Sequence, residues 1–222
     1  HPLAGYDTVE EIEDNYTWPS VDLFDFSVIP SQVKGKEAYA VRGGGSEPFL
    51  KYCQLRGLEQ AYVDLAMNPE IVTYGLDHLF AFAYESTTRI YEAIPGQVNV
   101  SYVAEDFGSQ ESLLISPRQI RTIFIPRMKR MIDLAHSAGA YVFFHSDGAV
   151  RKIIPDMIEA GIDVLNPIQW RCVGMGREGL KRDFGDRIVF HGAVDNQKTL
   201  PFGTVEDVVD EVITNIEILG DG

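Results

Sequence analysis

Short apolar runs alternate along most of the chain with longer stretches in which apolar residues recur at helical spacing. The alternation begins at Ala38 and is typical of βα units arranged around a parallel sheet. It predicts five strands, at residues 38–42, 97–103, 140–144, 163–165 and 187–190. The glycine run at residues 43–45, directly after the first strand, is interpreted as a loop.

Helices are predicted after these strands, at residues 48–55, 58–67, 69–94, 117–137, 150–160, 178–184 and 205–219. Ser116 and Pro117 are typical of a helix start, because serine caps the first turn and proline fits the first helical position. In the longest helix, Ile71, Leu79 and Ile90 belong to an apolar face with a spacing of roughly 3.6 residues.

Five βα units are fewer than the eight of a closed TIM-type barrel. Residues 1–36 predict a loop and a short helix but no strand. We therefore expect an α/β fold, a (β/α)8 barrel that is incomplete in this chain because its first and last strands are missing. Residues 1–222 are expected to form a single domain, truncated at both ends. An open doubly wound sheet would also hold five strands, but no GxGxxG loop follows the first of them.

Composition narrows the classes of partner. A net charge of −14 argues against nucleic acid, which is bound through clustered lysine and arginine. No run approaches the roughly 20 apolar residues that a membrane-spanning helix needs. The two cysteines, Cys53 and Cys172, form no CxxC motif, and no signal-peptide pattern is present. These features predict a cytoplasmic protein. The polar groups at the strand ends, described next, predict a small-molecule substrate.

Polar side chains follow the predicted strands at their carboxyl ends, where the loops of a βα barrel carry the active site. The candidate catalytic residues are Asp106, His145 and Asp147. The candidate substrate-binding residues are Arg42, Gln110, Asn166, Gln169, Asp195 and Gln197. Each could instead make a loop hydrogen bond, and the aspartates at 147 and 195 could cap helices.

His145 and Asp147 are the sharpest pair, because an imidazole and a carboxylate two residues apart can point at one centre. Both side chains are acceptable zinc ligands, but a catalytic zinc usually takes three protein ligands and keeps an open position. Two residues therefore do not define a metal site. A histidine that orients substrate through a hydrogen bond is the better interpretation from spacing alone.

Several stretches together resemble the uroporphyrinogen decarboxylase superfamily, from about Tyr16 to the end of the chain. They are AEDFGSQ at 104–110, ISP at 115–117, FHSDG at 144–148, IPDMIEAG at 154–161, DVLNPIQ at 163–169, GAVD at 192–195 with Gln197, and LPFG at 200–203. The resemblance implies a (β/α)8 barrel with its site at the carboxyl ends of the strands.

Two activities occur in that superfamily. Its decarboxylases remove carboxylates from a porphyrinogen without a cofactor and hold the pyrrole NH groups with an aspartate. Its methyltransferases move a methyl group from a corrinoid protein to a thiol or folate, and the thiol-using members hold zinc through a His-x-Cys motif and a later cysteine. The stretch around Asp106 and Gln110 resembles the methyltransferase-like branch.

The resemblance makes His145 the one family-matched zinc candidate, while Asp147 stands where the motif has cysteine. We therefore expect methyl transfer from a methyl-corrinoid protein to a thiol or folate acceptor, with zinc as a candidate cofactor. Uroporphyrinogen decarboxylation, in which Asp106 would hold the pyrrole NH groups, is the alternative lyase activity. A non-catalytic barrel that binds a corrinoid or tetrapyrrole is a second alternative.

Overall fold

The computed structural model describes residues 1–220, and the chain divides into two compact units. Unit 1 comprises His1–Glu105 and Ser137–Ala140. Unit 2 comprises Asp106–His136 and the chain from Tyr141 onward. No described helix has both the length and the apolar character needed to cross a membrane.

Unit 1 begins with short helical segments, and no strand occurs in residues 1–36, as predicted. These segments are α1 (Val9–Asn15), η1 (Val21–Leu23), η2 (Phe26–Val28) and α2 (Ile29–Val33). Three longer helices follow the first strand: α3 (Pro48–Arg56), α4 (Leu58–Met67) and α5 (Pro69–Ala93). Their bounds agree with the predicted helices within about one residue.

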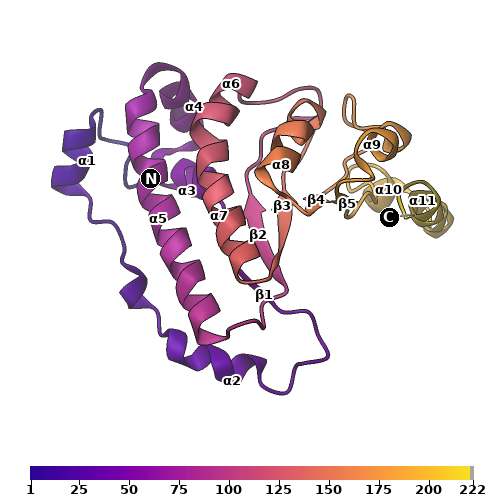
Figure 1. Cartoon of the computed structure of the whole chain (residues 1–222). Coiled ribbons are helices and arrows are strands. Elements are labelled where there is room, and N and C mark those ends of the chain that lie inside the picture. The colour runs from indigo at the N-terminus through magenta and orange to yellow at the C-terminus, as the bar shows by residue number, and fades with distance from the viewer. Residues whose placement is uncertain (221–222) are drawn as a thin grey trace. The chain divides into compact units, whose positions relative to one another are not determined.

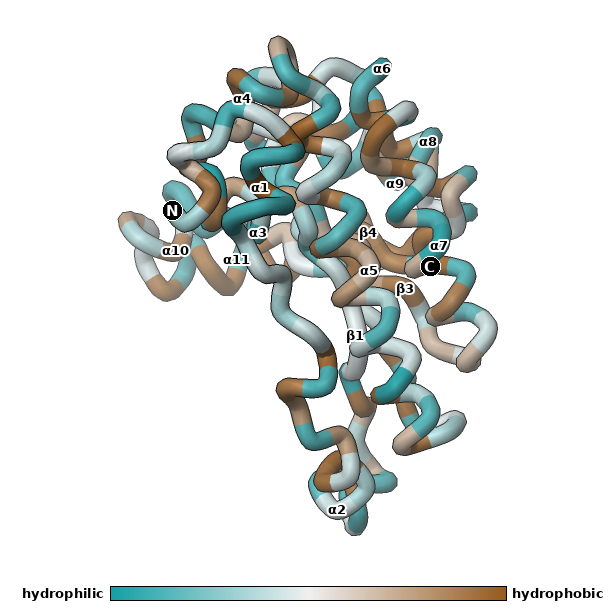
Figure 2. Tube along the Cα trace, turned by 90° about the vertical axis from the view of Figure 1, so that its left-hand side faces the viewer, coloured by the Kyte–Doolittle hydropathy of each residue, from teal (hydrophilic) through white to brown (hydrophobic). Residues whose placement is uncertain are grey.

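The two strands of unit 1 are parallel, and the long helix α5 packs against the first of them (Figure 1). They are β1 (Arg42–Ser46) and β2 (Val100–Ala104). The prediction for β1 was wrong, because the strand contains the glycine run that was interpreted as a loop. That run has no apolar side chains, so the tube through β1 is pale or teal whereas β3 (Tyr141–His145) and β4 (Val164–Asn166) are largely brown (Figure 2).

Glycine is required in β1 because the neighbouring strand approaches its backbone closely. A Cβ atom on Gly45 would lie 2.2 Å from the main-chain oxygen of Tyr102, and Gly45 has a φ of +147°. Its N–H donates to the Thr87 hydroxyl of α5 at 3.0 Å. A side chain at this position would therefore disturb both the strand pair and the helix contact.

A buried ion pair connects the start of the chain to α3 and α4. Arg56 Nε lies 2.6 Å from Asp64 Oδ2, and both side chains are almost fully buried. The Arg56 guanidinium also donates to the main-chain oxygens of Leu3 and Tyr6. Removing two charged groups from water costs free energy, and the ion pair offsets that cost only when hydrogen bonds also satisfy the remaining donors. Because the main-chain oxygens of Leu3 and Tyr6 are among these partners, the network fixes the N-terminal segment in unit 1.

Unit 2 contains three parallel strands in the order of the sequence, with His145 of β3 paired to Asn166 of β4. The third strand, β5 (Val189–Phe190), is short. The helices of unit 2 are α6 (Pro117–Gln119), the π-helical turn η3 (Ile120–Phe124), α7 (Ile125–Ser137), η4 (Arg151–Ile153), α8 (Ile154–Ala160), α9 (Arg177–Phe184), α10 (Thr199–Phe202) and α11 (Val205–Leu219).

The predicted helix at 117–137 is thus one helical stretch with a π-helical turn, and Ser116 caps it by accepting from Gln119 N. Helix α10 was not predicted. The described residues hold five strands that pair in parallel within each unit and alternate with helices. This is the predicted α/β fold, an open part of a TIM-type barrel rather than a closed one.

We predict that Gly45→Ala will destabilise the protein strongly, because the new Cβ would overlap the Tyr102 carbonyl oxygen in addition to straining the backbone. Gly96→Ala is the matched control, since Gly96 has a φ of +70° and nothing within 4 Å of a Cβ. Gly96→Ala should lower the free energy of unfolding by about 1–2 kcal/mol. Gly45→Ala should lower it by clearly more. Urea unfolding followed by circular dichroism measures both, and equal losses would contradict the steric explanation.

Candidate functional site

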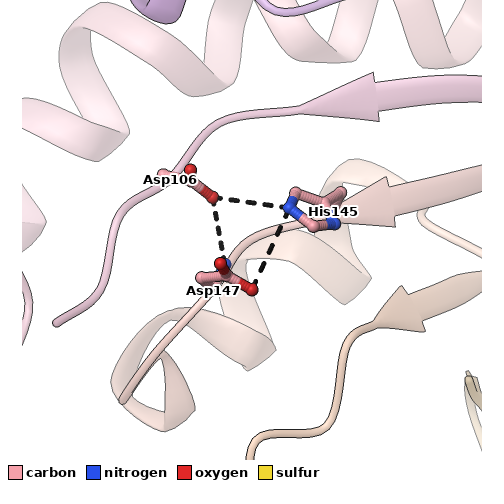
Figure 3. Close-up of side chains that lie close together, drawn as sticks. All are labelled: Asp106, His145 and Asp147. Carbon is pink, nitrogen blue, oxygen red and sulfur yellow. Dashed lines mark hydrogen bonds and ion pairs between the residues drawn. The ribbon is translucent and has the colours of Figure 1, made fainter. Parts of the chain in front are cut away.

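Three of the predicted site residues meet at the carboxyl ends of strands. His145 is the last residue of β3, and Asp147 follows it by two residues. Asp106 lies two residues beyond the end of β2, at the start of unit 2. Figure 3 shows the three side chains pointing toward one another.

One ligand atom from each of these residues lies within 4.8 Å of the other two. His145 Nε2 is 3.6 Å from Asp106 Oδ1 and 4.0 Å from Asp147 Oδ1. The Asp147 N–H donates to Asp106 Oδ1 at 3.1 Å. The side chains of Asp106 and Asp147 are 49% and 44% exposed, so a ligand can reach the cluster from solvent.

The two loops that carry the cluster pack backbone against backbone. The buried hydroxyl of Ser146 accepts from Phe107 N at 3.0 Å, and Ala149 N donates to Ser109 O at 2.7 Å. A Cβ atom on Gly108 would lie 2.6 Å from Asp147 O. Glycine at this position therefore allows the approach that brings Asp106 to His145.

The carboxyl group of Asp147 has a raised pKa. Burial is the main cause, the charge of Asp106 adds to it, and His145 opposes it. Asp147 consequently holds a proton more readily than an ordinary aspartate does. A cation bound at the cluster would relieve the repulsion between the two carboxylates and favour their charged forms.

A chain of side chains extends from His145 away from the two aspartates. His145 Nδ1 lies 2.8 Å from Asn166 Oδ1, and Asn166 Nδ2 lies 2.8 Å from His191 Nδ1. His191 directly follows β5, and its ring meets the Phe143 ring edge to face at 4.8 Å between centroids. Asn166, predicted to bind substrate, here contacts two imidazoles.

Two other predicted binding residues make hydrogen bonds between loops. Gln169 Oε1 accepts from Gly148 N at 2.7 Å and so supports the loop that carries Asp147. Gln110 is exposed, and its main-chain oxygen accepts from Val173 N.

Asp195 is buried, and several donors engage its carboxylate. It accepts from Gln197 N at 2.9 Å, from Thr199 N at 3.4 Å and from Arg171. Burial raises the pKa of Asp195, but these hydrogen bonds outweigh it and the pKa is lowered overall. Gln197 itself is exposed. These hydrogen bonds fix the Asp195 carboxylate just before α10.

Arg42 lies in unit 1, whereas the three-residue cluster lies in unit 2. Its guanidinium sits over the Tyr102 ring, 4.0 Å from the centroid. It lines a cavity of about 570 Å³ formed by residues of β1, α5 and the N-terminal segment, including Trp18 and Phe82.

Sequence reasoning missed the role of Ser146. Its hydroxyl joins the two loops of the site, yet the residue was passed over as the spacer between His145 and Asp147. The available signal was its place directly after a strand, where an inward-facing polar side chain must find a partner inside the protein.

The donor set of the cluster is one imidazole nitrogen and two carboxylates. Zn²⁺ accepts both types of ligand, and three protein ligands with an open position are typical of a catalytic site. The described residues at this cluster offer no thiolate, because aspartate occupies position 147 and the thiol of Cys172 is not among the clustered ligand atoms. The geometry therefore fits a divalent cation held mainly by oxygen.

Comparison with known proteins supports the fold and the family. Residues 34–222 match the family model described as uroporphyrinogen decarboxylase (URO-D). A solved structure of a methyltransferase from Methanosarcina mazei is similar, with a TM-score of 0.65 and 20% sequence identity over 86% of this chain. The match covers 53% of that protein, so this chain spans about half its length. No curated protein matches the sequence.

We predict that Asp195→Asn will lower the unfolding free energy by about 1–3 kcal/mol at pH 7, because a buried carboxylate that accepts three hydrogen bonds is replaced by a neutral amide. The lowered pKa means that this stabilisation is complete above the ordinary value of 3.8 and is lost as the pH falls below it. Urea unfolding should show a smaller difference in unfolding free energy between wild type and Asp195→Asn at pH 3 than at pH 7. Asp186→Asn, at an exposed position, is the control, and a difference unchanged by acid would contradict a charged Asp195.

Proposed function

The chain belongs to the uroporphyrinogen decarboxylase (URO-D) family, and from this membership we propose that it transfers a methyl group from a methyl-corrinoid protein to a small acceptor. The reaction would take place at the cluster of Asp106, His145 and Asp147. The observation that carries the proposal is the meeting of three ligand atoms from two strand ends within 4.8 Å. The similarity in fold to a methyltransferase favours methyl transfer over decarboxylation.

The cluster would hold one divalent cation, with zinc as the first candidate because histidine and aspartate are both zinc ligands. Such an ion, when bound, lowers the pKa of a thiol or water that occupies its open position. His145 would supply Nε2, and the two aspartates would supply one oxygen each. Their partial exposure leaves a side open to the acceptor.

The transfer breaks the bond between carbon and cobalt, and the bonding electron pair stays on cobalt while carbon bonds to the acceptor heteroatom. The acceptor must lose its proton in this process. Asp147 is the candidate proton acceptor, because burial raises the pKa of its carboxyl group. It would leave the cation when it takes up the proton. Asp106 would then remain the ligand that fixes the position of the ion.

Metal content tests the cluster directly. We expect about one zinc per chain in the purified protein, and loss of that zinc in His145→Ala. His136→Ala is the matched control, since His136 pairs with Asp163 at 2.9 Å and is not part of the cluster. Elemental mass spectrometry gives the ratio. A metal-free wild type that also fails to bind added Zn²⁺ or Co²⁺ would contradict the cation site.

Turnover tests the reaction. With methylcobalamin as donor and a simple thiol or tetrahydrofolate as acceptor, we expect loss of the methyl-corrinoid absorbance. Asp147→Asn should slow the reaction by about 10²–10⁴-fold, because the amide can neither accept the proton nor supply a charged oxygen to the cation.

His136→Ala should stay close to the wild-type rate. Decarboxylation of uroporphyrinogen without consumption of methylcobalamin would replace the proposal by the lyase activity. Corrinoid or tetrapyrrole binding with neither reaction would indicate a binding protein.

A further inference from the structure

One amide in unit 2 bridges two imidazoles. Asn166 Oδ1 lies 2.8 Å from His145 Nδ1, and Asn166 Nδ2 lies 2.8 Å from His191 Nδ1. Both distances lie in the range of a direct hydrogen bond. The three side chains come from the ends of three neighbouring parallel strands, since His145 ends β3, Asn166 ends β4 and His191 follows β5.

The chemistry of the amide assigns the protons on both rings. The amide oxygen can only accept, so His145 Nδ1 must carry a hydrogen. The amide nitrogen can only donate, so His191 Nδ1 must offer a lone pair and its hydrogen sits on Nε2. When His145 is neutral, its lone pair is therefore on Nε2, the nitrogen nearest Asp106 and Asp147.

The orientation of the amide decides this outcome. A flipped Asn166 would present its NH2 group to His145 Nδ1 and force the hydrogen of a neutral His145 onto Nε2. That tautomer has no lone pair directed at the two carboxylates and cannot bind a cation there. His191 opposes the flip as long as its Nδ1 carries the lone pair, because that lone pair accepts from the NH2 group. The Phe143 ring packs against the His191 ring and holds it beside the amide.

We propose that Asn166 and His191 are positioning residues that hold His145 in the Nδ1–H tautomer and keep its Nε2 lone pair directed at the Asp106–Asp147 cluster. The effect on a bound cation rests on the proposed function, whereas the tautomer is a property of the protein alone. His191 acts without touching the cluster, through Asn166. Asn166 is thereby assigned to orientation of His145 rather than to substrate.

The tautomer can be read from the chemical shifts of imidazole nitrogens. The sequence has five histidines, so [15N]histidine labelling gives few signals, and His145→Gln identifies the one from His145. Spectra of the metal-free protein would be recorded at pH about 9, where imidazoles are neutral. We expect wild-type His145 to be the Nδ1–H form.

Two variants of Asn166 distinguish the effect of its acceptor oxygen from that of its donor NH2 group. Asn166→Leu removes both, and we expect His145 to move to the Nε2–H form. Asn166→Asp keeps an oxygen acceptor and should preserve the Nδ1–H form. His191→Phe keeps an aromatic ring against Phe143 but removes the acceptor for the amide, so both tautomers of His145 should be populated.

Cation affinity provides the second readout. Titration with Co²⁺ should show affinity about 10- to 100-fold weaker in Asn166→Leu than in wild type, and near-wild-type affinity in Asn166→Asp. Circular dichroism would verify that each variant is folded. Loss in both variants would indicate a general structural role and would overturn the assignment of Asn166.

The proposal is overturned if wild-type His145 is the Nε2–H form, or if Asn166→Leu leaves the tautomer unchanged. If the tautomer of His145 were unchanged in His191→Phe, His191 would not be a positioning residue. Failure of the proposed function has a different signature, because absent methyl transfer or absent cation binding would leave the tautomer of the metal-free protein as expected.

Discussion

The candidate site depends on the close contact between the loop after β2 and the loop after β3. Gly108 and Gly148 permit it, because a Cβ atom on either would lie within 2.6 Å of main-chain atoms of the facing loop. The Ser146 hydroxyl and the Asp147 N–H then add bonds across the same contact. Without this close contact, the Asp106 carboxylate would not lie beside the His145 imidazole. The side-chain cluster therefore depends on glycine at these two backbone positions.

The polar residues at the strand ends differ in how many of their hydrogen-bond acceptor sites are already occupied by donors of the protein. Three backbone or side-chain donors engage Asp195, and Gln169 is committed to Gly148 N. Asp106 receives one backbone hydrogen bond, and both it and Asp147 remain partly exposed. Carboxylates with remaining acceptor sites next to an imidazole are the ones able to bind a cation or a proton, which singles out the cluster from its neighbours.

Much of the fold could be predicted from the sequence, because helices such as α3, α4 and α5 carry both periodic apolar residues and clear boundary residues. The bounds of strand β1 could not be predicted, since its glycine run meets a backbone requirement and shows no apolar pattern. The meeting of Asp106, His145 and Asp147 followed from their places at strand ends. The hydrogen bonds from Asn166 to His145 and His191 could not be predicted from the sequence, because they depend on the register of β3 with β4 and on the rotamer of the Asn166 side chain.

The choice of an amide at position 166 is consistent with the charge of the site. A carboxylate there would also accept from His145 Nδ1, but it would place a third negative charge beside Asp106 and Asp147 in a chain whose net charge is already −14. The repulsion would raise the pKa of Asp147 further and would disfavour its charged form in the absence of a cation. Asparagine supplies the same acceptor without that charge, and its NH2 group gains a partner in His191 that holds the acceptor in place.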